Sequence, residues 1–261
     1  MLKNIIQVKL KVFIVLVLAL RISLISDAKY PNIVYILADD LGYGDVQCLN
    51  PERGKIETPR MDQLASEGMV FTDAHTSSSV CTPTRYSILT GRYNWRTRLQ
   101  SFVLMGYDES LIAQDRMTVA DFLQQQGYKT AAIGKWHLGM GMSTKDGKPA
   151  DKSGDNVDWK GVIRNGPVDH GFDYFYGISS SLNIPPFIYI KDDRFVGEAT
   201  VKKSFWRGLE GYAQIDFEDV DVLGEIRGKT TDYIHQQQAA RSTSLGQGKP
   251  FFIYVSLTSP H

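Results

Sequence analysis

The feature that most constrains the fold is a capped helical segment followed directly by a short apolar run. In "TVADFLQQQG" (118–127), Thr118 is a good helix N-cap with Asp121 three residues further on, and Gly127 is a typical stop. The run from Tyr128 to Ile133 then predicts a strand. The side chains expected on the core face of the helix are Val119, Phe122 and Leu123.

The same pattern occurs elsewhere in the chain. "TPRMDQLASEG" (58–68) predicts a helix capped by Thr58, and "MVFTDAH" (69–75) predicts a strand after it. The apolar runs at 33–37 and 251–257 predict strands buried on both faces of a sheet. Alternating strands and helices predict an α/β fold with a mostly parallel sheet flanked by helices.

Two segments differ from this pattern. Residues 140–170 are polar and indicate a surface excursion, and residues 191–231 mix charged and aromatic side chains like an insertion. Phe187, Tyr189, Phe205 and Trp206 could stack on a sugar or aryl ring, although packing is the expected role for most of them.

The first residues are typical of an export signal. A basic start and a short apolar run precede small and polar residues, so we expect a cleaved signal peptide at 1–28 rather than a stable membrane anchor, which is the alternative. An exported location (periplasmic, secreted or lysosomal-type) follows. The chain has 29 basic and 29 acidic residues, and this balance argues against a nucleic-acid partner.

Polar residues follow three of the predicted strands. Asp39 and Asp40 end the first, Lys135 and His137 follow the strand after Gly127, and His261 follows the last. Ligands of open α/β sheets bind beyond the carboxyl ends of the strands, so these side chains should meet at one edge. Taken singly, such residues more often belong to a turn, a cap or a solvated loop.

The chemistry of the set points to an anionic substrate. Adjacent carboxylates repel unless a cation lies between them, and oxygen ligands favour hard ions such as Ca²⁺ or Mg²⁺. A lysine and histidines can hold an oxyanion or move protons. A cation beside such groups indicates a sulfate or phosphate ester.

"CTPTRYSILTG" (81–91) predicts a helix that begins near Cys81 and stops at Gly91. A helix N-terminus attracts anions and should lower the pKa of the thiol. Arg85 could return toward the same end. The alternative for Cys81 is a disulfide with Cys48.

These segments together resemble the type I, formylglycine-dependent sulfatases. "CTPTR" with "YSILTGR" resembles the family's C-x-P-x-R signature, "GYKTAAIGKWHLG" its second signature, "PNIVYILADDLGYGD" its opening strand and calcium turn, and "TSPH" a third active-site segment. The resemblance implies an alkaline-phosphatase-like core. It also implies an arylsulfatase-like enzyme whose Cys81 is oxidised to formylglycine by a partner, the formylglycine-generating enzyme.

Residue roles follow from the same resemblance. Asp39, Asp40 and the modified residue 81 would ligate one Ca²⁺, with Mg²⁺ possible, and Arg85 would support the formylglycine. Lys135 and His261 would bind the sulfate and assist the leaving group.

His137 would orient the hydrated aldehyde and act as a base. Ser181 is predicted on the sulfate side, with Ser179 and Ser180 competing for that place, and Asn183 is predicted to line the substrate pocket. The implied substrate is a sulfated small molecule or glycan.

The sequence departs from the family at its end. An Asp-Asn pair, a second active-site lysine and a C-terminal subdomain are expected beyond His261, so residues 29–261 are interpreted as the incomplete N-terminal part of a sulfatase catalytic domain. Two alternatives stay open at this point: a related phosphatase or phosphodiesterase of the same superfamily, and a non-catalytic truncated remnant.

Overall fold

The computed structural model describes residues 30–243 and 248–261, with the side chains of 241–243 left aside. The chain divides into the units Met1–Pro31 and Asn32–His261, and every described helix and strand belongs to the second. The signal peptide predicted at 1–28 lies outside the described residues. Within the described part, no helix is long and apolar enough to cross a membrane.

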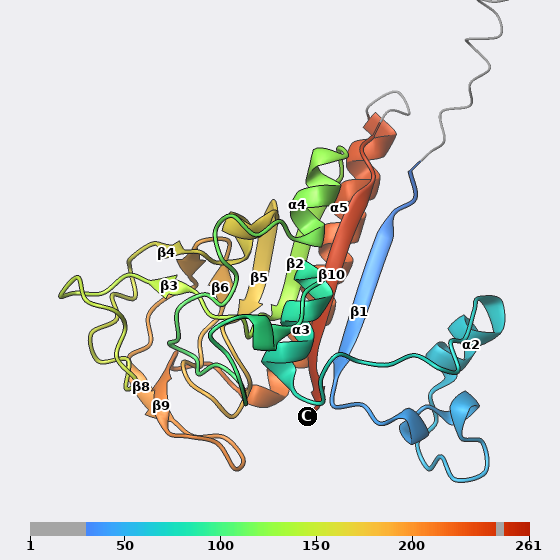
Figure 1. The fold of residues 1–261 in the computed structure, drawn as a ribbon, viewed down its shortest axis with the longest axis horizontal. Helices are drawn as coiled ribbons and strands as arrows, with labels where there is room; N and C mark the ends of the chain where they lie inside the picture. Colours follow the sequence, from blue (N-terminus) through green and yellow to red (C-terminus); the bar gives the residue numbers. More distant parts are fainter. Residues whose placement is uncertain (1–29, 244–247) are drawn as a thin grey trace, which may run out of the picture. The chain divides into compact units, whose positions relative to one another are not determined.

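A six-stranded sheet forms the centre of the second unit (Figure 1). Its order is β1-β10-β2-β5-β6-β7, and the first four strands run parallel. The strands are β1 (Ile33–Asp39), β10 (Phe251–Pro260), β2 (Lys129–Lys135), β5 (Tyr174–Ile178), β6 (Ile190–Lys191) and β7 (Arg194–Phe195). This arrangement confirms the predicted α/β fold with a mostly parallel sheet.

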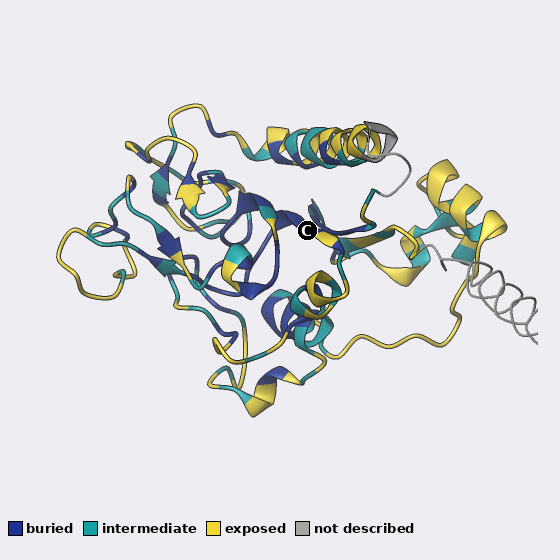
Figure 2. Cartoon of the chain, turned by 90° about the horizontal axis from the view of Figure 1, so that it is seen from above, coloured by how far each residue is buried: buried dark blue, intermediate teal, exposed yellow. Residues whose placement is uncertain are grey.

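Helices cover both faces of the sheet, as Figure 2 shows from above. The helices α3 (Cys81–Thr90) and α4 (Val119–Gln125) pack on one face, and α5 (Val222–Thr243) packs on the other. Successive residues of β2 serve opposite faces, because Ala132 packs with the α3 side while Ala131 and Ile133 pack with the α5 side. The core therefore lies in two layers with the sheet between them.

The predicted strand β1 is less buried than its apolar sequence suggests. Val34 is 44% exposed and Ile36 is 60% exposed. In the described sheet β1 has a single neighbour, β10, whereas β10 itself lies between β1 and β2. The expectation of burial on both faces is therefore wrong for β1 and confirmed for β10.

Three local predictions are also wrong. Residues 69–75 form no strand, and Met69 and Phe71 are 77% and 72% exposed, because no neighbouring strand pairs with them. Phe122 is 51% exposed, since α4 approaches the core through Ala120 and Phe122 lies roughly 200° further around the helix. The capping box of Thr118 and Asp121 is confirmed, and so is the helix predicted at 58–68, which is α2 (Pro59–Glu67). The cap predicted at Thr58 is wrong, because its side chain accepts no hydrogen bond from the first turn and donates instead to Asp62 Oδ1.

The two unusual segments contain more structure than predicted. Short antiparallel pairs join β3 (Gly141–Met142) to β4 (Ile163–Arg164) and β8 (Val201–Lys203) to β9 (Gly211–Ala213). Trp159 is buried, so residues 140–170 are not simply a surface excursion. Helix α5 begins inside 191–231 and was not predicted.

Candidate active site

The carboxyl ends of β1 and β2 bring two opposite charges together. Lys135 Nζ lies 2.5 Å from Asp39 Oδ2, and both side chains are buried. Burial by itself raises the pKa of Asp39, but the charges of Lys135 and Arg85 outweigh it and hold that pKa below its usual value. Asp39 is therefore a carboxylate held between two cations.

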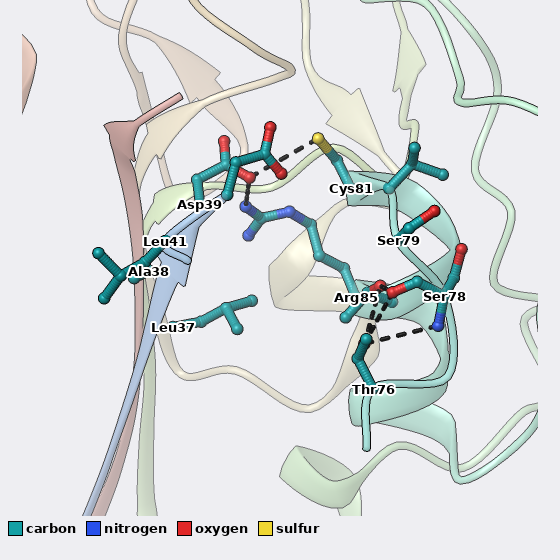
Figure 3. Close-up of a pocket in the computed structure, with 12 residues that line it drawn as sticks. Leu37, Ala38, Asp39, Leu41, Thr76, Ser78, Ser79, Cys81 and Arg85 are labelled. Atoms are coloured by element: carbon teal, nitrogen blue, oxygen red, sulfur yellow. Dashed lines mark hydrogen bonds and ion pairs between the residues drawn. The ribbon is translucent and has the colours of Figure 1, made fainter. Parts of the chain in front are cut away.

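Arg85 reaches this edge from the first turn and a half of α3, as the sequence predicted (Figure 3). Its Nη2 atom lies 3.2 Å from Asp39 Oδ1, and its Nη1 atom donates to Ser256 Oγ and to the main-chain oxygen of Lys135. Tyr254 Oη lies 3.5 Å away. The guanidinium is 1% exposed, so these contacts fix its position.

Cys81 is the first residue of α3, which confirms its predicted place at a helix N-terminus. Its Sγ lies 3.6 Å from Asp39 Oδ1 and 3.1 Å from Lys135 Nζ. Cys81 and Cys48 are both free, so the disulfide alternative is wrong. The expected lowering of the thiol pKa is also wrong: burial raises it, and Lys135 does not compensate in full.

His137 lies at the same edge in a buried, left-handed backbone position with φ of 54°. Its Nε2 is 2.9 Å from the carbonyl oxygen of Leu104, which can only accept, so Nε2 carries the proton. Nδ1 has no hydrogen-bond partner within the described residues. Burial, followed by the charge of Lys135, lowers the pKa of His137 to about 3, so the imidazole is neutral near pH 7.

Asp40 and His261 form a second pair at the rim. His261 Nδ1 lies 2.6 Å from Asp40 Oδ2, and the main-chain N–H of His261 donates to the oxygen of Asp39 at 3.0 Å. The potential ligand atoms of Asp39, Cys81 and His261 lie within 4.8 Å of one another. All five residues predicted at the strand ends are thus at one edge of the sheet.

One of the three candidate serines reaches the buried lysine. Ser181 Oγ is 3.1 Å from Lys135 Nζ, whereas Ser180 Oγ donates to the carbonyl of Ile184. Ser179 Oγ has no partner among the described residues. The geometry therefore favours Ser181 over its neighbours, as predicted, and the role of Ser181 stays a prediction.

Two hollows open beside Cys81. The first, of about 280 Å³, lies between the end of β1 and the start of α3, and Figure 3 shows it lined by Asp39, Cys81 and Arg85. The second, of about 160 Å³, is lined by Cys81, His137 and Ser181, with Asn183 also on its wall. A group bound to residue 81 would therefore meet the imidazole and the hydroxyl together.

Sequence reasoning missed the residues that hold this site in place. Ser256 and Tyr254 of β10 accept hydrogen bonds from Arg85, and Thr82 Oγ1 donates to the carbonyl of His137 at 2.9 Å. A hydroxyl inside the buried run "FFIYVSL" was the signal that could have identified Ser256.

Carboxylates, a buried ammonium, a neutral imidazole and a helix N-terminus at the carboxyl edge of a parallel sheet define the site class. Such an edge is where open α/β folds bind their ligands. The Sulfatase family profile matches residues 31–261, and the chain belongs to that family. This agrees with the motif resemblance.

Named relatives and solved structures agree with the family. The chain is 37% identical over 172 residues to an N-acetylgalactosamine-6-O-sulfatase of Bacteroides thetaiotaomicron, covering 66% of this chain and 31% of that protein. It is 32% identical over 241 residues to human arylsulfatase D, covering 87% and 35%. The chain thus spans about a third of the length of these relatives.

The fold is similar to that of a Bacteroides thetaiotaomicron protein that is described as part of the metabolism of multiple glycosaminoglycans. The TM-score is 0.72 at 27% identity, over 90% of this chain and 52% of that one. A sulfatase from Pseudoalteromonas sp. has a TM-score of 0.59 at 25% identity, over 89% and 44%. These likenesses support the α/β assignment.

Proposed function

We propose that this protein hydrolyses the sulfate ester of a carbohydrate or an aryl alcohol, with residue 81 as the nucleophile after its conversion to formylglycine. One observation carries the proposal: Cys81 begins α3 with its Sγ 3.1 Å from Lys135 Nζ and 3.6 Å from Asp39 Oδ1. A nucleophile there meets a cation that can neutralise sulfuryl oxygens. The names of the relatives, which are carbohydrate and aryl sulfatases, support the substrate class.

The side chains around residue 81 suit distinct tasks. Lys135 and Ser181 can donate to sulfate oxygens from one side, and His261 can assist the leaving group from the rim. Arg85 holds the Asp39 carboxylate beside residue 81. These roles are part of the proposal.

His137 suits the role of general base. Its Nε2 proton is committed to Leu104, so the lone pair on Nδ1 is available to take a proton from a hydroxyl on residue 81. The pKa of about 3 keeps the ring unprotonated near neutral pH, but a ring with so low a pKa is a weak base, so negative charge bound at residue 81 would have to raise it for this role. A ring with both nitrogens protonated could not act in this way.

The donor set fits a calcium ion in part. Asp39 and Asp40 supply carboxylate oxygens, and an oxygen in place of the sulfur of residue 81 would add another donor close to Asp39. Ca²⁺ takes about six to eight oxygens, so water and substrate oxygens would complete the shell. When bound, the ion would supply positive charge for the sulfuryl oxygens.

The proposal extends to maturation and location. A formylglycine-generating enzyme is the partner that would replace the sulfur of Cys81 by an aldehyde oxygen. Export is proposed from the pattern of residues 1–28, which combines a basic start with a short apolar run.

The test is made on protein from a host that contains the maturation enzyme. Mass spectrometry of the peptide with residue 81 should show the aldehyde, and the protein should release sulfate from a chromogenic aryl sulfate. Cys81→Ala should abolish release while leaving the fold intact, because Cys81 is only partly buried. An intact thiol, or release that persists in Cys81→Ala, would overturn the proposal.

A further inference from the structure

A third hollow, of about 330 Å³, adjoins the pocket at Cys81. It is lined by Asp40, Leu182, Asn183, Phe205, Trp206, Arg207, Asp219 and His261. Three of these residues, Asp40, Asn183 and His261, also line the pocket at Cys81. The two hollows therefore share a wall, and a ligand held at residue 81 can extend directly into the third hollow.

The outer wall of this hollow is a tight turn with its two large side chains directed to solvent. Trp206 is 78% exposed, and the guanidinium carbon of Arg207 lies over its ring at 4.5 Å. Phe205 packs instead against Phe187, with ring centroids 4.8 Å apart, and anchors the turn to the core. The indole face and the guanidinium are thus presented on a fixed base.

The turn is tied to the catalytic side of the molecule. The N–H of Leu209 donates to the carbonyl of Asn183 at 3.0 Å, and the N–H of Gly208 donates to Phe205 at 2.8 Å. A Cβ at Gly208 would lie 2.9 Å from the Cα of Asn183, so the two segments are in close contact. Arg207 has a φ of 54°, a backbone conformation that residues other than glycine adopt only when their surroundings hold them there.

Within the described part of the chain, Arg207 has no partner of opposite charge. Among residues 30–243 and 248–261, no ion pair and no hydrogen bond of its guanidinium is found, although Asp219 and Asp40 line the same hollow. Asn183 Oδ1 is buried and likewise has no hydrogen-bond partner in the described part of the chain. The hollow therefore offers the indole face that Arg207 leaves uncovered, a cation with no acidic partner among the described residues and a free acceptor beside the reaction pocket.

We propose that this hollow is a second subsite, which binds the sugar next to the sulfated one in an anionic glycan. Trp206 stacks on the apolar face of that sugar, and Arg207 pairs with a carboxylate or a sulfate on it. Asn183 accepts a hydrogen bond from a hydroxyl. The inference rests on the proposed function, and it selects an oligosaccharide with charge on the neighbouring sugar over a simple aryl sulfate.

The test measures binding without turnover. The probes are three disaccharides, all of which lack the ester sulfate at the reacting sugar. They differ in the neighbouring sugar, which is neutral in the first, carries a carboxylate in the second and carries a sulfate in the third. Calorimetry on the full chain should show that an anionic disaccharide binds about fivefold or more tightly than the neutral one, as for an exposed ion pair. The tighter of the two anionic probes identifies the recognised group.

Variants assign the effect to the two side chains. Arg207→Gln should remove the preference for the anionic probe, Arg207→Lys should keep part of it, and Trp206→Ala should weaken all three probes. Trp95→Ala is the matched control, since Trp95 is 56% exposed and stacks on Tyr93 outside the hollow. Equal binding of neutral and anionic probes, or an unchanged preference in Arg207→Gln, would overturn the subsite.

Hydrolysis of the aryl sulfate separates this inference from the proposed function. Turnover with no Arg207-dependent binding removes the subsite and leaves the hydrolase. Arg207-dependent binding without turnover supports the subsite and removes the hydrolase. Melting curves of the variants should match the parent protein, because Trp206 and Arg207 lie on the surface.

Discussion

At the scale of single residues, Lys135 shows how a fully buried charge is accommodated here. An ammonium has three N–H donors, and the side chain has three acceptors within reach: Asp39 at 2.5 Å, Cys81 at 3.1 Å and Ser181 at 3.1 Å. All three come from different segments of the chain. A sulfate that binds at residue 81 must therefore replace one of these three acceptors of Lys135. The sulfur of Cys81 is the acceptor that conversion to formylglycine would remove.

His137 gives a prediction of pH dependence. Its pKa is about 3 in the folded protein, whereas an unfolded histidine has an ordinary value of about 6.5. Below about pH 6.5 the unfolded chain binds a proton that the folded chain does not, so the free energy of unfolding should fall with decreasing pH down to about pH 3. The slope should approach about 1.4 kcal/mol for each pH unit in that range.

Denaturant unfolding of the parent protein and of His137→Gln between pH 7 and pH 4 measures this slope. Glutamine cannot titrate, so the free energy of unfolding of the variant should depend less steeply on pH, by the contribution of about one proton. This holds even if the variant is less stable at every pH. His170, which is also buried with a lowered pKa, remains in both proteins and accounts for a common remainder. Parallel curves for the two proteins would contradict the assignment.

At the scale of secondary structure, the contact between β2 and β5 depends on Gly177. Gly134 pairs with Gly177, and a Cβ built at Gly177 would lie 1.8 Å from the carbonyl oxygen of Gly134. Gly177→Ala should therefore push the strands apart beside Lys135 and lower the free energy of unfolding by about 3 kcal/mol.

The same substitution has the opposite sign in α5. A Cβ at Gly224 meets nothing within 4 Å, and alanine is favoured over glycine inside a helix by about 1 kcal/mol. Gly224→Ala should thus raise the midpoint of urea unfolding while Gly177→Ala lowers it. An unchanged or raised midpoint in Gly177→Ala would show that the close approach of β2 and β5 leaves no room-dependent cost.

Elements with strong local signals were predictable from the sequence. Helices α3 and α4 have a stop glycine or a capping box, and β2 and β10 are continuous apolar runs, so each was placed within a few residues. Helix α5 was missed because its buried apolar residues, Val222, Ile226 and Tyr233, are sparse along 22 residues. The exposure of β1 depends on its place in the sheet, which local sequence does not specify.

The candidate site divides in the same way. The rule that ligands lie beyond strand ends located Asp39, Lys135 and His261, because it depends only on strand direction. The contact of Arg85 with Ser256 joins residues 171 positions apart, and no local pattern encodes it. The pKa of Cys81 was misjudged because the helix N-terminus was visible in the sequence and the burial was not.

At the scale of the whole described chain, three hollows meet around one short stretch of the sheet edge. Asp40 lines all three, and Cys81 lines two. The proposed cation, reaction and sugar sites therefore share walls rather than acting separately. Removing the charge of Asp40 should lower the affinity for the metal ion before it affects the other two sites, because Asp40 is the half-exposed carboxylate where the three hollows meet.

Calcium should stabilise the protein through Asp39 and Asp40. A ligand that binds only the folded state at a hundred times its Kd adds about 2.7 kcal/mol, which raises Tm by roughly 5–10 °C in a chain of this size. Thermal melting with and without CaCl₂ measures the gain, and Mg²⁺ should give a smaller one because it gives up its water reluctantly. Asp40→Asn should remove most of the gain, whereas Asp151→Asn, in an exposed loop, should retain it. Identical gains in both variants would place the ion elsewhere and withdraw Asp40 from the proposed cation site.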